Sequence, residues 1–155
     1  MKNYALLVFV CCLSACTAQP HVDWQAKHIA ALSQTEVELS VSLWTDLMPK
    51  IGMTTESGNE NPTINVNGYL VLQASESLPP SLTLLTLVLR QGDQIWAIPE
   101  SQIELRPALK TSWEVVFNSA LELDLNRPVS VALALKSEGK ELWLVEHRVS
   151  IDKVY

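Results

Sequence analysis

Few side chains in this sequence have the types and spacing needed to do chemistry together. His21 and His28 lie near the start of the chain, and Met48 and Met53 could add the soft sulfur ligands that copper prefers. No dense cluster of Cys and His residues accompanies them, and scattered methionines usually fill gaps in a core. We therefore predict no metal ion and no cofactor, and keep a copper-like site as an alternative.

Catalytic motifs are also missing from the sequence. There is no Gly-x-Ser-x-Gly motif and no glycine loop of the kind that cradles phosphate. Glu36 and Glu38 fall on one polar strand face, and Glu56 and Glu60 share a polar loop, so both carboxylate pairs are expected at the solvated surface. With no nucleophile, base or oxyanion donor to assign, we predict that the protein is not an enzyme.

The first 16 residues have the pattern of a secretory signal. Lys2 supplies a positive start, an apolar run extends from Tyr4 to Leu13, and small residues follow it. A membrane-spanning helix needs about 20 apolar residues, and this run is shorter. The segment therefore predicts export rather than a spanning helix.

The end of this segment, Leu13-Ser14-Ala15-Cys16, resembles the lipobox of bacterial lipoproteins. The resemblance implies that Cys16 takes a diacylglyceryl thioether, that residues 1–15 are removed, and that the new amino terminus is acylated. Because Thr17 is not Asp, the resemblance further implies an outer-membrane location facing the periplasm. The alternative is an ordinary signal peptide, which would leave Cys16 as a free or paired thiol.

Composition restricts the possible partners of the mature chain. Removal of residues 1–15 takes away one basic residue and no acidic one, so the formal net charge changes from −6 to −7. Nucleic acids and anionic membrane surfaces need Lys and Arg to neutralise phosphate, so we predict no nucleic-acid partner. The length corresponds to one domain, whose fold rests on its apolar core because no cysteine pair remains for a disulfide.

Residues 16–34 are interpreted as the lipidated N-terminus followed by a tether. Within it, residues 23–32 predict a short helix that Asp23 would cap, with Trp24 and His28 on one face. Such a short helix is marginal alone, so the segment either docks on the domain or serves as a spacer.

From Thr35 onward the hydrophobic period changes to two, which is typical of half-buried strands. Gly68 inside one segment suggests a bulge, Pro107 is expected to close another, and Ser137 to Lys140 predict a hairpin turn. The almost wholly apolar run from Leu82 to Arg90 predicts a central strand covered on both faces. Expected strand segments are residues 35–46, 64–73, 82–90, 94–98, 103–106, 113–118, 121–125, 129–135 and 142–151.

This pattern predicts an all-β fold, specifically an immunoglobulin-like or fibronectin-like β-sandwich of about 7–9 antiparallel strands. The expected organisation is a lipoprotein signal peptide over residues 1–15, a lipidated N-terminus and tether over 16–34, and a single sandwich domain over 35–155. The long polar loop that follows Asp46 and runs to Pro62 is the best candidate for a functional loop.

Two of the five tryptophans fall on the less apolar side of their strands. By parity, Trp44 joins Ser40 and Ser42, and Trp143 lies opposite Leu142 and Leu144. Each could anchor a partner or pack under a loop. We predict the contact surface within residues 44–62, and the candidate contact residues are Trp44, Asp46, Met48, Met53 and Trp143.

Taken together, these features predict a non-catalytic envelope lipoprotein, anchored at the outer membrane through Cys16 and facing the periplasm. It would act as an interaction or accessory module for an envelope protein, with sheet edges and end loops as contact surfaces. The alternative function is a periplasmic sandwich that binds a small ligand or a metal such as copper.

Overall fold

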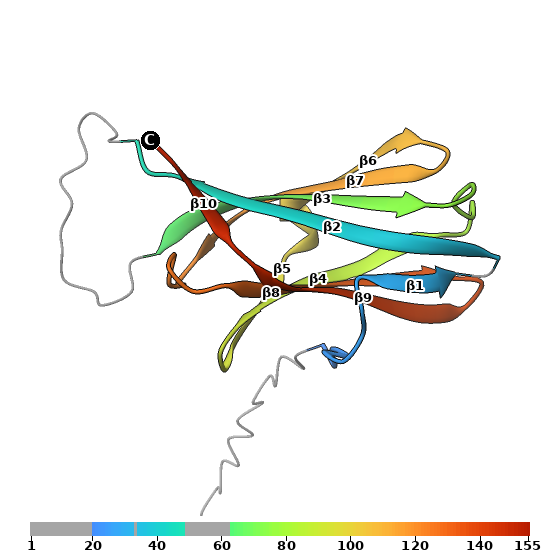
Figure 1. The fold of residues 1–155 in the computed structure, drawn as a ribbon, viewed down its shortest axis with the longest axis horizontal. Coiled ribbons are helices and arrows are strands. Elements are labelled where there is room, and N and C mark those ends of the chain that lie inside the picture. Colours follow the sequence, from blue (N-terminus) through green and yellow to red (C-terminus); the bar gives the residue numbers. More distant parts are fainter. Residues whose placement is uncertain (1–19, 33, 49–62) are drawn as a thin grey trace, which may run out of the picture.

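The computed structural model describes residues 20–32, 34–48 and 63–155. This part of the chain is almost entirely β-structure, so the predicted all-β class is confirmed (Figure 1). Its elements are β1 (Ile29–Leu32), β2 (Thr35–Asp46), β3 (Ile64–Ala74), β4 (Thr83–Gln91), β5 (Gln94–Ile98), the 3₁₀ turn η1 (Glu100–Gln102), β6 (Ile103–Leu109), β7 (Ser112–Leu121), β8 (Val129–Ser137), β9 (Lys140–Val149) and β10 (Ile151–Val154).

The strands form two sheets packed face to face. Sheet A has the order β1-β2-β3-β7-β6, and sheet B has the order β5-β4-β8-β9. The orders β2-β3-β7-β6 and β5-β4-β8-β9 correspond to strands A-B-E-D and C′-C-F-G of an immunoglobulin-like sandwich. The predicted sandwich is therefore confirmed, and its topology brings β3 and β7 together although about 50 residues separate them along the chain.

The end of the chain crosses from sheet B to sheet A, a feature that was not predicted. β9 belongs to sheet B, whereas β10 pairs parallel with the second half of β2 in sheet A. Arg148, at the end of β9, has a φ of 60°, and the pairing register with β8 shifts beside it. Such a bulge bends a strand, so the chain can leave sheet B here. Together with β1, this strand raises the number of strands in the described part of the chain to ten, and its parallel pairing is an exception to the predicted antiparallel arrangement.

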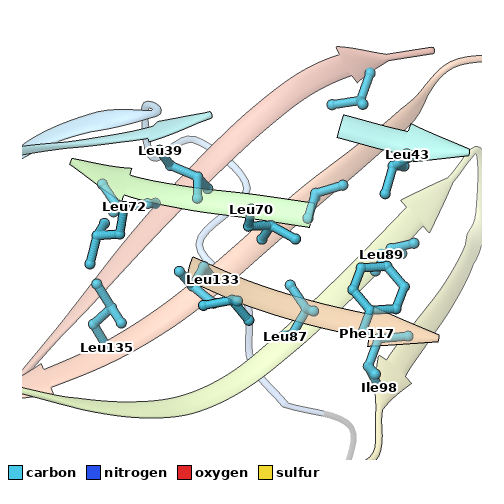
Figure 2. Close-up of a cluster of buried hydrophobic side chains, with 14 of the residues drawn as sticks. Leu39, Leu43, Leu70, Leu72, Leu87, Leu89, Ile98, Phe117, Leu133 and Leu135 are labelled. Atoms are coloured by element: carbon cyan, nitrogen blue, oxygen red, sulfur yellow. The ribbon is translucent and has the colours of Figure 1, made fainter. Parts of the chain in front are cut away.

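The core lies between the two sheets, where alternate residues of each strand point inward. This arrangement follows from the period of two, since successive side chains of a strand point to opposite faces. Figure 2 shows the two inner faces meeting. The buried side chains include Leu39, Leu43, Leu70, Leu72 and Phe117 from sheet A, and Leu87, Leu89, Ile98, Leu133 and Leu135 from sheet B.

Gly68 makes room for the largest fully buried side chain. A Cβ atom built on Gly68 would lie 1.9 Å from Cε1 of Phe117. The two residues face each other across β3 and β7, and the register continues through them without a shift. The predicted bulge at Gly68 is therefore wrong, because the glycine allows a ring to approach the backbone rather than a change of register.

Two other predictions about strand ends are wrong. Residues 122–128 form a loop instead of a strand, and Gln91 holds this loop in place. The Gln91 side chain donates to the carbonyl oxygens of Asp124 and Arg127, both at 2.9 Å, and accepts from the Asp124 N–H at 2.8 Å. β6 also continues through Pro107, and proline is tolerated there because β6 is an outer strand of sheet A.

The hairpin predicted around Gly139 is confirmed as a tight two-residue turn. β8 ends at Ser137 and β9 begins at Lys140, which leaves only Glu138 and Gly139 between them. Their φ angles are 51° and 79°. Positive φ at both central positions is what a type I′ hairpin turn requires, and its twist matches that of the flanking strands.

The segment expected to form a short helix is extended instead. Residues 20–28, named the strap from here on, have no helix, and Ile29–Leu32 form β1. Asp23 makes a turn, because its Oδ1 accepts from the Gln25 N–H at 3.0 Å and its carbonyl accepts from the Ala26 N–H at 3.1 Å. The strap lies against sheet B, on the side facing away from sheet A, so of the two alternatives the structure shows docking over this stretch (Figure 1).

Candidate functional site

The structure places the predicted contact residues on different faces. Trp44 is half-buried on the outer face of sheet A. Asp46 ends β2, where its Oδ1 accepts from the Met48 N–H at 2.8 Å, and the Met48 side chain is 57% exposed. Trp143 lies on the outer face of sheet B. Cys16 and Met53 lie outside the described residues.

Trp143 is packed within the protein rather than left open. It lies beside a small second core formed by the buried residues Val88, Ala132 and Val145. The strap contributes Val22, Trp24 and Ala26 to the same cluster. Trp143 is therefore half-buried against the same small core on which the strap packs.

The strap is tied to the sandwich by backbone and ring contacts. The carbonyl oxygen of Lys27 accepts from the Val145 N–H at 3.0 Å, and that of His28 accepts from the Leu39 N–H at 2.7 Å. The Arg90 guanidinium carbon lies 4.2 Å from the centre of the Trp24 ring, a cation–π contact. The first two contacts join the strap to both sheets, since Val145 belongs to β9 and Leu39 to β2.

Trp44 borders a depression of about 450 Å³ on the outer face of sheet A. The strand register explains its position, because Trp44 of β2 pairs with Asn67 of β3, which pairs with Asn118 of β7. Asn118 Nδ2 donates to Asn67 Oδ1 at 2.7 Å. The main lining residues, from β2, β3, η1, β6 and β7, are Trp44, Asn67, Gln102, Glu104, Val116 and Asn118.

Charged and phenolic groups continue from this depression along the same sheet face. Arg106 donates to both carboxylate oxygens of Glu104, at 2.8 and 2.7 Å, and these bonds lower the pKa of Glu104. A hydrogen bond with Glu114 raises the pKa of the Tyr69 phenol. This part of the face therefore holds paired polar groups, of which the Arg106–Glu104 pair is an ion pair.

A second recess, the apolar groove, lies at the tip of the β6–β7 hairpin and has a volume of about 630 Å³. Leu109 is 69% exposed there, although it is a large apolar side chain. A hydrogen bond of 2.8 Å from the Leu78 N–H to the Lys110 carbonyl ties the β3–β4 loop to the hairpin. The main lining residues of the apolar groove are Leu78, Pro79, Pro80, Pro107, Leu109 and Trp113.

The two recesses suit different chemistry. The depression beside Trp44 offers an aromatic surface with amide groups, which suits a small polar ligand. The apolar groove is lined by three prolines and an exposed leucine, which suits the apolar side chains of a protein partner. Trp44 was among the predicted contact residues, whereas Asn67, Asn118 and Leu109 were not. Parity placed Asn67 on the polar face of its strand, but the register that aligns it with Trp44 was not readable from the sequence.

The candidate ligands of the alternative copper-like site are not brought together among the described residues. His21 and His28 are both exposed on the strap. Over residues 20–32, 34–48 and 63–155, no three side chains of His, Cys, Asp or Glu lie close enough together to hold a metal ion. The same part of the chain contains no helix with the length and hydropathy of a membrane span.

Comparison of the chain with protein-family models, with curated proteins and with solved structures found no match.

Proposed function

We propose that this protein is a lipid-anchored, non-catalytic interaction module of the bacterial envelope. In this proposal Cys16 carries the lipid, the chain is cut before it, and Thr17 directs the product to the outer membrane facing the periplasm. The support for this part is the resemblance of residues 13–16 to a lipobox. The partner is an envelope protein that presents apolar side chains.

The observation that carries the interaction role is the apolar groove. Soluble domains rarely leave large apolar side chains together at the surface unless a partner covers them. Leu109 is 69% exposed beside Pro79, Pro80 and Pro107, whose rings are stiff and already in place. A preformed surface of this kind binds with little loss of conformational entropy.

Side-chain docking in the apolar groove is favoured over strand addition at β6. β6 is the outer strand of sheet A, but Pro107 has no N–H to offer, and the register with β7 shifts between Pro107 and Leu109. Prolines and bulges on outer strands oppose pairing with another chain. The partner is therefore expected to insert side chains rather than to add a strand.

Site-specific crosslinking in living cells tests this proposal. Leu109 is replaced by photoreactive benzoylphenylalanine, and the same replacement of the exposed loop residue Glu122 is the matched control. We expect a discrete protein adduct from position 109 that is absent from position 122. The same adduct from both positions, or none from position 109, would contradict the proposal.

The lipid anchor is tested separately by mass spectrometry of the mature protein. We expect an acylated amino terminus at Cys16, and we expect Cys16→Ser to abolish both cleavage and acylation. An unmodified Cys16 thiol, or cleavage at another bond, would refute the anchor without affecting the crosslinking result.

The depression beside Trp44 favours a second candidate function, the binding of a small ligand. Trp44, Asn67 and Asn118 come from three neighbouring strands and form one row on a face that no described segment covers. Convergent polar groups around an aromatic side chain are typical of ligand sites.

A further inference from the structure

We propose that the depression beside Trp44 binds a neutral oligosaccharide built of pyranose rings. This inference rests on the second candidate function, ligand binding, and is independent of the lipid anchor and of the apolar groove. Three features of the depression carry it: an aromatic surface, an amide pair with free hydrogen-bonding groups, and a described lining that contains no cation.

The aromatic surface is Trp44. A pyranose ring has one face of C–H groups and an edge of hydroxyl groups, so it binds best where a flat apolar surface lies beside hydrogen-bonding groups. The negatively polarised face of an indole attracts the weakly positive C–H hydrogens. Trp44 is half-buried on a sheet face of mixed polarity, so part of the residue remains exposed.

The amide pair supplies the hydrogen bonds. Asn118 Nδ2 donates to Asn67 Oδ1, which fixes both side chains. Asn67 Nδ2 and Asn118 Oδ1 then have no hydrogen-bond partner among the described residues, so a donor and an acceptor remain side by side. Two neighbouring sugar hydroxyls, each both donor and acceptor, match this arrangement.

The extent of the depression fits a short chain rather than a single ring. Its lining runs from Trp44 on β2 to Glu104 on β6, and β3 and β7 lie between them. Neighbouring strands are about 4.8 Å apart, so the row spans roughly 14 Å. Gln102 adds an amide at the η1 end of the row.

The charge of the depression favours a neutral ligand over an anionic one. Among the described residues of the lining, Glu104 is the only charged one, and Arg106 neutralises it through two hydrogen bonds. No free cation of the lining is available to a phosphate or carboxylate, and the whole chain has a formal net charge of −6. Anionic ligands would therefore be repelled rather than attracted.

Calorimetric titration of the mature, lipidated protein tests the proposal. The protein is held in a detergent without a sugar headgroup, and the probes are chitotetraose, cellotetraose and maltotetraose. We expect saturable binding of at least one probe with a dissociation constant of about 1 mM or tighter. Loss of a single neutral hydrogen bond corresponds to roughly a five- to tenfold weakening, which we expect for Asn118→Ala.

Two further variants make the result decisive. Trp44→Ala is expected to weaken binding by at least about tenfold and Trp44→Phe by less, because a smaller ring retains part of the stacking surface. Ser40→Ala, on the same face of the same strand, is the matched control and should leave binding unchanged. The Asn118 variant keeps the test valid if Trp44→Ala does not fold, since Asn118 is exposed.

Two results would overturn the proposal. One is the absence of saturable binding for all three probes at concentrations about tenfold above 1 mM. The other is binding that neither Asn118→Ala nor Trp44→Phe alters. Crosslinking from position 109 would be unaffected by either result, so failure of the saccharide site and failure of the interaction module are distinguishable.

Discussion

The two outer faces of the sandwich differ in composition and in what covers them. On sheet B, Val88, Ala132 and Val145 form one apolar row across neighbouring strands, and the strap lies over it. On sheet A, the corresponding rows are polar or mixed, and no described segment covers them. Trp24 on the first face is therefore a structural residue, whereas Trp44 on the second is half-buried with no described segment over it.

This difference in what covers each outer face explains why β2 and β8 have different burial patterns. β2 alternates between more buried and more exposed residues, because one face is core and the other is largely solvent, with Val41 and Trp44 half-buried. β8 is buried at nearly every position from Val129 to Leu135, because it lies between the core and the strap. The prediction that the run from Leu82 to Arg90 is covered on both faces is confirmed over the centre of β4, and the strap provides the second cover.

The sharpest test of the comparison is the same substitution on both faces. Val88→Asn would bury an amide without partners and remove packing, so we expect a loss of about 2–4 kcal/mol in the free energy of unfolding. Val71→Asn, on the outer face of sheet A, should cost less than about 1 kcal/mol. Urea denaturation measures both values, and equal losses would show that the two faces are not different environments.

The next largest effect is expected from the strap itself. Trp24→Ala should lower the free energy of unfolding by about 2–3 kcal/mol, less than for a fully buried tryptophan because Trp24 is half-buried. Hydrogen exchange at the Val145 amide, which bonds to Lys27, should accelerate as the strap loosens. An unchanged Val145 exchange rate would mean that Trp24 does not hold the strap in place.

The cation–π contact should contribute less than the packing. Arg90→Gln is expected to lower the free energy of unfolding by about 0.5–1 kcal/mol, because the contact lies near the protein surface. Arg127→Gln, which replaces an exposed arginine on the β7–β8 loop, is the control and should have little effect. A loss of the same size in the control would assign the effect to net charge instead of the ring contact.

The smallest effect concerns the titration of Tyr69 on the outer face of sheet A. Its pKa is raised in the folded protein, so its contribution to stability is present below the ordinary tyrosine pKa of about 10 and is lost as pH rises. We expect Glu114→Gln to lower the Tyr69 pKa. Phenolate absorbance in a Tyr155→Phe background isolates this group in the mature chain, and an unaltered titration in Glu114→Gln would exclude the Glu114 contact as its cause.

Much of the fold was predictable from local patterns. The alternation of Val37, Leu39, Val41 and Leu43 placed β2 and assigned its faces, and it put Trp44 on the polar side. The turn at Gly139 was recognisable because few residues adopt positive φ without strain. The strap had a readable signal as well, since Val22, Trp24 and Ala26 alternate with polar residues at a period of two. The helix prediction failed because it placed Trp24 and His28 on one face at a period of 3.6 and took Asp23 as the helix cap.

Other features had no local signal. In the sequence, Gln91 is an ordinary polar residue at a strand end. Its structural role is to hydrogen-bond a loop more than 30 residues away along the chain. The bulge suggested by Gly68 was wrong, because the Phe117 ring that needs the space comes from a different strand. β6 is an outer strand and leaves Leu105 and Leu109 38% and 69% exposed, and no local pattern shows which strand lies at the edge of a sheet.

The amino-acid sequence by itself determined the all-β class and the two faces of most strands, because a period of two is a property of neighbouring residues. Tertiary structure alone decided that the strap covers sheet B, that β10 crosses to sheet A, and that Trp44, Asn67 and Asn118 form one row. These outcomes depend on which strands pair and in which register. Pairing is decided by the apolar surface that distant segments bury together, and no local pattern records that choice.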